Sequence, residues 1–135
     1  MRYLVDTSAW IDYLRDTDDA HVRRLHALLE PPSPVVLTPV VFPELLQGAR
    51  DDATFKTHRA FFGSQPFVFQ SHPVDSHVEA ARIYQRCRQA GVTIRSTVDC
   101  LIARIAIEHG LVVLHDDEDF RRIARVDKRL KEISR

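Results

Sequence analysis

Short apolar runs alternate along the chain with longer segments in which apolar residues recur every three or four positions. The runs at residues 3–5, 35–37, 67–69 and 111–114 are rich in β-branched or aromatic side chains, which is typical of short buried strands. The longer segments carry the 3.6-residue period of amphipathic helices. Strands that alternate with helices predict an α/β fold, with three α/β/α layers around a short, mainly parallel central sheet.

Residue types that favour helix ends flank each helical segment. The expected helices run from a cap at Thr7 or Ser8 to Leu14, from Asp18 or Asp19 to Leu29, from Thr38-Pro39 to near Gly48, from Asp51 or Asp52 past Phe61-Phe62, from Asp75-Ser76 to Gly91, from Ser96 or Thr97 to Gly110, and briefly through Ile123. Ser76 and Glu79 are expected to form a capping box. The segment after Asp127 is too charged for an assignment.

The composition is that of an ordinary globular domain. With 135 residues, 44% apolar and 28% charged, the chain is expected to form one domain, residues 1–135. Its 19 basic and 19 acidic residues cancel, so any binding of a polyanion must come from local clusters. Cys87 and Cys100 fall in helical patterns, and no signal or membrane-spanning segment is evident. We therefore expect buried, reduced thiols in a cytoplasmic protein.

Acidic residues recur at equivalent points of the predicted fold. Asp6 follows the first strand, and Asp117 and Asp119 follow the last predicted strand. Glu44 and Asp99 lie in or near the first turns of helices. Because strand ends and the first turns of the following helices share one edge of a parallel sheet, these carboxylates can converge there.

Each acidic residue also has a plain structural interpretation. Asp6 can help to cap the first helix, and Asp117 or Asp119 can cap the short helix through Ile123. Asp99 can complement a helix macrodipole, and the Glu44 carboxylate can simply be solvated. These interpretations explain the residues one at a time, but not why all of them occupy equivalent topological points.

Carboxylates that share a pocket repel one another, and a divalent cation removes this repulsion. Oxygen ligands favour Mg²⁺ or Mn²⁺ over zinc. Such a site can generate hydroxide near neutral pH and stabilise the leaving oxygen of a phosphodiester. Among the basic residues near the acidic segments, Arg95 and Arg121 are those we expect to help to hold a polyanionic substrate.

Four motifs, in their order along the chain, resemble those of the PIN domain. They are Val5-Asp6-Thr7-Ser8, Pro43-Glu44-Leu45, Val98-Asp99-Cys100-Leu101-Ile102-Ala103 and His115-Asp116-Asp117-Glu118-Asp119-Phe120. Each motif is weak alone, but together they are specific and span nearly the whole chain. The likeness is closest to the VapC-type toxins of bacterial toxin–antitoxin pairs.

This resemblance implies a Mg²⁺-dependent endoribonuclease, usually a homodimer, that a VapB-type antitoxin holds inactive. It makes Asp6 and Asp99 the principal metal ligands, joined by Asp117. Glu44 would complete the acidic set, with Asp119 close behind Asp117. Related sequences vary in which acid of residues 115–119 reaches the metal, so the choice between Asp117 and Asp119 stays open here.

Aromatic residues suggest where an antitoxin could bind. Trp10, Phe42, Phe61 and Phe62 exceed what a small core clearly needs, so some of them could line a groove for an antitoxin helix. The alternative is that all four are buried.

Three other functions remain open at this level. A haloacid-dehalogenase-like phosphatase would use an aspartyl nucleophile, but it wants a second Asp where this chain has Ser8. A receiver domain wants an early acidic pair and a late lysine, and neither stands out. A catalytically inactive PIN-like binding module is disfavoured, because none of the acidic positions is lost.

Overall fold

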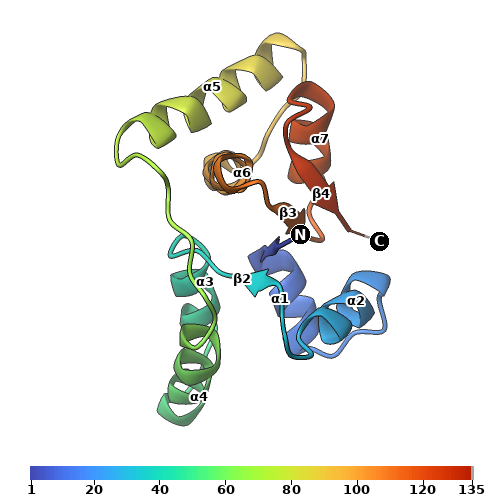
Figure 1. The fold of residues 1–135 in the computed structure, drawn as a ribbon, viewed down its shortest axis with the longest axis vertical. Helices are drawn as coiled ribbons and strands as arrows, with labels where there is room; N and C mark the ends of the chain where they lie inside the picture. The colour runs from blue at the N-terminus through green and yellow to red at the C-terminus, as the bar shows by residue number, and fades with distance from the viewer. Residues whose placement is uncertain (135) are drawn as a thin grey trace.

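A four-stranded parallel sheet forms the centre of the computed structural model, which describes residues 1–134 (Figure 1). Its strands are β1 (Tyr3–Val5), β2 (Val35–Val36), β3 (Val112–Leu114) and β4 (Lys131–Ile133), in the order β2-β1-β3-β4. Tyr3 lies opposite Val35 on one side and Val112 on the other. The predicted α/β fold with a parallel sheet is confirmed.

All seven predicted helices are present in the described chain. They are α1 (Thr7–Leu14), α2 (Ala20–Leu28), α3 (Phe42–Gln47), α4 (Asp52–Gly63), α5 (Asp75–Gln89), α6 (Thr97–His109) and α7 (Glu118–Val126). In Figure 1, α5, α6 and α7 lie on one side of the strands and α1 and α2 on the other, while α3 and α4 extend away as a hairpin. The helices thus cover both faces of the sheet, as the pattern predicted.

The core extends over both faces of the sheet, with α6 on one face and α1 and α2 on the other. Leu4, Val5, Val113 and Leu114 of the two central strands are fully buried, as expected for a parallel sheet covered on both faces. Helix α6 is the most buried helix, as its continuous apolar pattern suggests, and it contains Cys100. Cys87 and Cys100 are both free and buried, as predicted. Across residues 1–134, no helix is long and apolar enough to cross a bilayer.

The start of α1 differs in detail from the prediction. The residue that caps this helix is Asp6, not Thr7 or Ser8: its Oδ2 accepts a 3.0 Å hydrogen bond from the Ser8 backbone N–H. The same residue therefore ends β1 and begins α1. The plain structural interpretation of Asp6 is correct as far as it goes.

The predicted strand at 67–69 is wrong. Only one parallel bridge forms there, between Leu37 and Phe67, with the Val68 N–H donating to the Leu37 carbonyl at 2.8 Å. The ladder stops because Pro39 has no N–H and the chain turns at Thr38, whose carbonyl accepts the N–H groups of Val41 and Phe42. For the same reason α3 begins at Phe42 rather than at Pro39.

The predicted capping box of Ser76 and Glu79 is also wrong. Helix α5 already begins at Asp75, so Ser76 lies inside it. Its buried hydroxyl donates to Glu108 Oε2 at 2.7 Å and accepts the His72 N–H at 3.1 Å. Ser76 therefore joins α5 to α6 instead of capping α5.

Strand β4 lies in the segment that the sequence left unassigned. It pairs in parallel with β3, with Val113 opposite Glu132. An edge strand is held by its backbone on one side only and needs little apolar surface, which is why a charged segment can form it.

Two glycines at helix ends provide a test of the backbone. Gly110 ends α6 at φ +63°, whereas Gly48 ends α3 at φ −75°, and both have room for a methyl group. We expect Gly110→Ala to lower the free energy of unfolding by about 1 kcal/mol, because an L-residue is strained in the left-handed region. Gly48→Ala should raise the free energy of unfolding by ~0.5 kcal/mol, because alanine lowers the conformational entropy of the unfolded chain. Urea unfolding of both variants measures the difference, and equal effects would contradict this fold at α6.

Candidate metal centre

The acidic residues meet at the carboxyl edge of the sheet, as the topology predicted. Asp6 ends β1, and its N–H donates to the carbonyl of Leu114 at the end of β3. Asp117 follows β3 and caps α7, while Asp99 lies in the first turn of α6. Glu44 stands in the first turn of α3, at the rim of this group.

Three carboxylates form the tightest set. Asp99, Asp117 and Asp119 each offer one ligand atom, and these three atoms lie within 4.8 Å of one another. Oδ2 of Asp99 is buried and has no hydrogen-bond partner among the described residues. An ionised carboxylate oxygen that is buried without a partner is costly, and a cation is the group that would satisfy it.

The electrostatics of Asp99 point the same way. Burial, followed by the negative charges of Asp6 and Asp117, raises its pKa to about 9. In the absence of a cation this carboxyl group is therefore neutral at pH 7. A divalent ion would return it to the ionised form, which is the form that ligates.

Asp119 is held almost entirely by the protein. Its Oδ2 accepts the backbone N–H groups of Arg95 at 3.0 Å and Ser96 at 3.1 Å, and its Oδ1 faces Arg122 at 3.3 Å. Burial opposes its ionisation, but these hydrogen bonds and the charge of Arg95 bring its pKa below the usual value. Asp119 thus fixes the chain just before α6 and, with it, the position of Asp99.

Asp117 differs from Asp119 in having an oxygen to spare. Its Oδ1 accepts the Asp119 N–H at 2.9 Å and Nη2 of Arg95 at 3.1 Å. No hydrogen bond to its Oδ2 is present in residues 1–134. Of the two acids that the sequence left open, Asp117 is the one with an oxygen available to an external ligand.

Asp6 lies beside this set but is not part of the group within 4.8 Å. Its buried Oδ2 accepts both the N–H of Ser8 and the Ser8 hydroxyl, the latter at 2.6 Å. Burial raises the pKa of Asp6, the Ser8 hydrogen bonds lower it, and the charge of Asp117 raises it again. Asp6 therefore contributes to the field at the site while Ser8 holds one of its oxygens.

Glu44 is exposed and joins the site through α1. Thr7 Oγ1 donates to its Oε1 at 3.3 Å. Partial burial and the charge of Asp6 raise the pKa of Glu44. Glu44 is thus close enough to sense the site, yet it remains open to solvent.

The two arginines expected to bind substrate line one cavity. Its volume is about 320 Å³, and its walls are Arg95, Asp116, Asp117, Glu118 and Arg121. Arg95 pairs with Asp117, while Arg121 pairs with Glu118 and donates to Ser134 Oγ at 2.8 Å. Both guanidinium groups thus lie beside the site, already paired with carboxylates, and their role toward substrate stays a prediction.

Two buried histidines brace the acidic segment. Nδ1 of His115 accepts the Asp117 N–H at 3.1 Å, which assigns the ring proton to Nε2, and Nε2 donates to Glu132 of β4 at 2.8 Å. His115 therefore has a structural role, because it holds the backbone of Asp117 against β4. His21 was not singled out by the sequence, because its partners come from different elements: its Nε2 lies 2.7 Å from Asp12 and 3.9 Å from Asp116.

Asp12, Asp19 and His21 also place one ligand atom each within 4.8 Å of one another. His21 already has a short hydrogen bond to Asp12, so this group joins α1 to α2 without an ion.

Known proteins resemble this chain over most of its length. Residues 3–126 match the family model of the PIN domain. The chain is 40% identical over 126 residues to a VapC ribonuclease of Mycobacterium bovis and to the ribonuclease VapC11 of Mycobacterium tuberculosis. In each case the match covers 91% of this chain and 92% of the relative.

Solved structures share the fold at lower identity. VapBC2 from Rickettsia felis, bound to a DNA fragment from its promoter, superposes with a TM-score of 0.75 at 17% identity, covering 100% of this chain and 99% of that one. VapC20 from Mycobacterium tuberculosis, described as a sarcin–ricin loop cleaving toxin, gives a TM-score of 0.62 at 24% identity, covering 88% of this chain and 92% of the other.

The pKa of Asp99 predicts how stability depends on pH without metal. Because its pKa is raised in the folded protein to about 9, the stabilisation by its proton is complete below pH ~4 and is lost as the pH rises through 9. In chelator, the free energy of unfolding of the wild type should fall from pH 5 to pH 9. Asp99→Asn should show a shallower fall, measured by urea unfolding at each pH. Parallel profiles for the two proteins would mean that Asp99 does not titrate in this range.

Proposed function

The chain belongs to the PIN domain family and, within it, to the VapC ribonucleases, and we propose that it is a Mg²⁺-dependent endoribonuclease that acts as the toxin of a toxin–antitoxin pair. The observation that carries this proposal is the close set of Asp99, Asp117 and Asp119, together with the unpartnered Oδ2 of Asp99. A donor set made only of carboxylates fits Mg²⁺, with Mn²⁺ as a substitute, better than it fits zinc.

The residues divide the work at this site. Asp99 and Asp117 would hold the ion, and Asp6 would add its charge from the end of β1. Asp119 keeps Asp99 in position through the N–H groups of Arg95 and Ser96. When bound, Mg²⁺ supplies the charge that activates water and stabilises the leaving oxygen of the phosphodiester.

The phosphatase alternative fits the geometry less well. An aspartyl nucleophile needs a carboxylate oxygen aimed at substrate. Oδ2 of Asp6 instead accepts two hydrogen bonds from Ser8, and the Ser8 hydroxyl in turn accepts the Asp116 N–H at 2.9 Å. Ser8, at the position where such a phosphatase needs a second Asp, thus holds Asp6 and the chain at Asp116 and supplies no carboxyl group. A binding module would not need the unpartnered Asp99 oxygen.

Loss of a carboxylate from the site should end RNA cleavage. We expect Asp99→Asn and Asp6→Asn to reduce cleavage of a structured RNA in Mg²⁺ or Mn²⁺ by about 100-fold or more, because each removes a charge from the metal site. Chelator should abolish the wild-type activity. Asp75→Asn is the matched control, since Asp75 is also in the first turn of a helix but lies exposed on α5. Undiminished cutting by Asp99→Asn would overturn the assignment.

A groove beside the site suits a VapB-like antitoxin. A cavity of about 280 Å³ lies between α1, α3 and α4, with Ile11, Leu14 and Leu45 among its apolar walls and Glu44 and Arg15 as its charged ones. Ile11 and Leu14 are 37% and 42% exposed, which is unusual for large apolar side chains on one helix. An amphipathic antitoxin helix could bury its apolar face there and place a basic residue on Glu44.

The four aromatic residues singled out in the sequence differ in burial, and Phe42 is partly buried beside another cavity. Trp10 and Phe62 are fully buried, which agrees with the plain interpretation for those two. Phe61 is 37% exposed and stacks on Tyr13, with the ring centroids 6.5 Å apart. Of the four aromatic residues, Phe61 is the one we assign to the antitoxin surface.

A homodimer is the remaining part of the proposal. The face of α5 and α6 exposes Val74, Val78 and Val98, and it holds a cavity of about 320 Å³ lined by Ala81 and Tyr84 among others. We assign this apolar face to a second copy of the chain; it shares no lining residue with the antitoxin groove.

Introducing charged side chains into the groove tests whether the antitoxin binds there. We expect the native protein, recovered from its host, to carry a small partner in stoichiometric amount. The double variant Ile11→Glu/Leu14→Glu should lose this partner, because two buried charges without counter-ions oppose docking of an apolar helix face. Phe69→Glu is the control, since Phe69 is 58% exposed but lies away from the groove. Retention of the partner by the double variant, quantified by mass spectrometry, would place the antitoxin elsewhere.

A further inference from the structure

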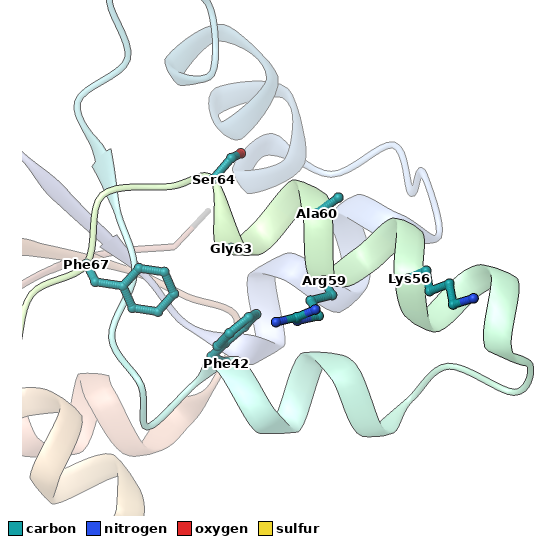
Figure 2. Close-up of a pocket in the computed structure, with 7 residues that line it drawn as sticks. All are labelled: Phe42, Lys56, Arg59, Ala60, Gly63, Ser64 and Phe67. Atoms are coloured by element: carbon teal, nitrogen blue, oxygen red, sulfur yellow. The ribbon is translucent and has the colours of Figure 1, made fainter.

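A second groove lies on the other side of the α3–α4 hairpin. It encloses about 570 Å³ and is lined by Phe42, Lys56, Arg59, Ala60, Gly63, Ser64 and Phe67 (Figure 2). Two aromatic rings lie at one end, and two cationic side chains follow along α4. No carboxylate lines this groove, unlike the two cavities next to the acidic site.

The sequence of α4 creates this surface. Lys56, Arg59, Ala60 and Gly63 occupy positions i, i+3, i+4 and i+7, which form one face of a helix. The small residues leave room at the end where α3 approaches: a Cβ atom at Gly63 would lie 3.7 Å from Cζ of Phe42. In Figure 2, Arg59 reaches from α4 towards Phe42.

The two cations of the groove have no partners. Both side chains are exposed, and neither Lys56 nor Arg59 makes an ion pair or a side-chain hydrogen bond in residues 1–134. The arginines around the acidic site are different, because Arg95, Arg121 and Arg122 are each paired with a carboxylate. The groove therefore offers positive charge that no part of the described chain neutralises.

The two rings offer flat apolar surface beside this charge. Phe42 and Phe67 pack edge to face, with centroids 5.3 Å apart and an interplanar angle of 68°. Both are only partly buried and border the groove. Aromatic side chains next to unpaired cations are the combination that binds single-stranded nucleic acid, by stacking on bases and neutralising phosphates.

From this combination we propose that the α3–α4 groove is a second binding site for the RNA strand, with Lys56 and Arg59 on phosphates and Phe42 and Phe67 against a base. The proposal rests on the ribonuclease function, because it locates nucleotides that flank the cleaved bond. Phe42 and Glu44 are two residues apart on α3 and so project from opposite sides of it. The strand would pass around a helix ~10–12 Å thick to connect the groove with the acidic site.

The experiment measures RNA binding without cleavage. In chelator, fluorescence anisotropy gives the Kd of a single-stranded RNA of about 12 nucleotides as a function of salt. Lys56→Ala/Arg59→Ala should lower the magnitude of the salt slope by about 1.4, or 0.7 for each phosphate contact, and weaken binding roughly 25-fold at 0.1 M salt. The control, Arg82→Ala/Lys128→Ala, removes an exposed Arg from α5 and an exposed Lys from the turn after α7 and should change neither value. Photo-crosslinking of 4-thiouridine RNA to wild type should label Phe42 or Phe67.

The outcomes separate this site from the ribonuclease function itself. If the double variant binds like wild type while wild type still cleaves RNA, the groove is not an RNA site and the enzyme assignment stands. If the double variant binds RNA with a higher Kd but with an unchanged salt slope, the proposal is also overturned, because no phosphate contact would have been removed. If wild type neither binds nor cleaves RNA in any divalent ion, the ribonuclease function fails as well. All variants change exposed side chains, and their melting curves should match that of wild type.

Discussion

Several carboxylates lie close together at one edge of the parallel sheet, and their mutual repulsion must not destabilise the fold. The protein meets this constraint by giving most carboxylates a hydrogen-bond donor. Ser8 donates twice to Asp6, and the backbone of Arg95 and Ser96 donates to Asp119. Oδ2 of Asp99 has no such donor within residues 1–134, and burial, followed by the charges of Asp6 and Asp117, raises the pKa of Asp99 to about 9. The metal-free protein thus tolerates the cluster by leaving one member protonated.

The donors that hold the cluster also connect distant parts of the chain. The Ser8 hydroxyl links the end of β1 to the Asp116 N–H after β3, and Asp119 links α7 to the segment before α6. These links are made by short side chains and backbone groups, which have little conformational entropy to lose. Asp6 and Asp119 are therefore held in place by these hydrogen bonds, while the carboxylates of Asp117 and Glu44 remain open to a ligand.

The sequence was sufficient for the architecture and for the place of the site, because both follow from local patterns. Strand ends and first helical turns are visible in the order of apolar and acidic residues, and parallel topology brings them together. What it could not supply were properties that depend on partners far along the chain. Nothing at Asp117 or Asp119 reveals which has a spare oxygen, since that is decided by Arg95 and Ser96.

The same limit explains the errors in secondary structure. Residues 67–69 have the side chains of a strand, but their neighbour turns away after Leu37 and leaves only one bridge. Ser76 has the spacing of a capping box, but Glu108 from another helix takes its hydroxyl. Strand β4 is the opposite kind of error: its sequence is too charged to indicate a strand, but pairing with β3 makes the segment a strand.

The position of β4 near the end of the chain determines when the acidic site is completed during synthesis. Glu132 of β4 fixes the ring of His115, and that ring accepts the N–H of Asp117. On the ribosome, every acidic residue of the cluster is translated before Glu132. The nascent chain therefore holds all the carboxylates of the centre before Asp117 is fully braced. Residues 131–133 complete the site last, so a chain whose synthesis stops short of them would carry the cluster without its final support.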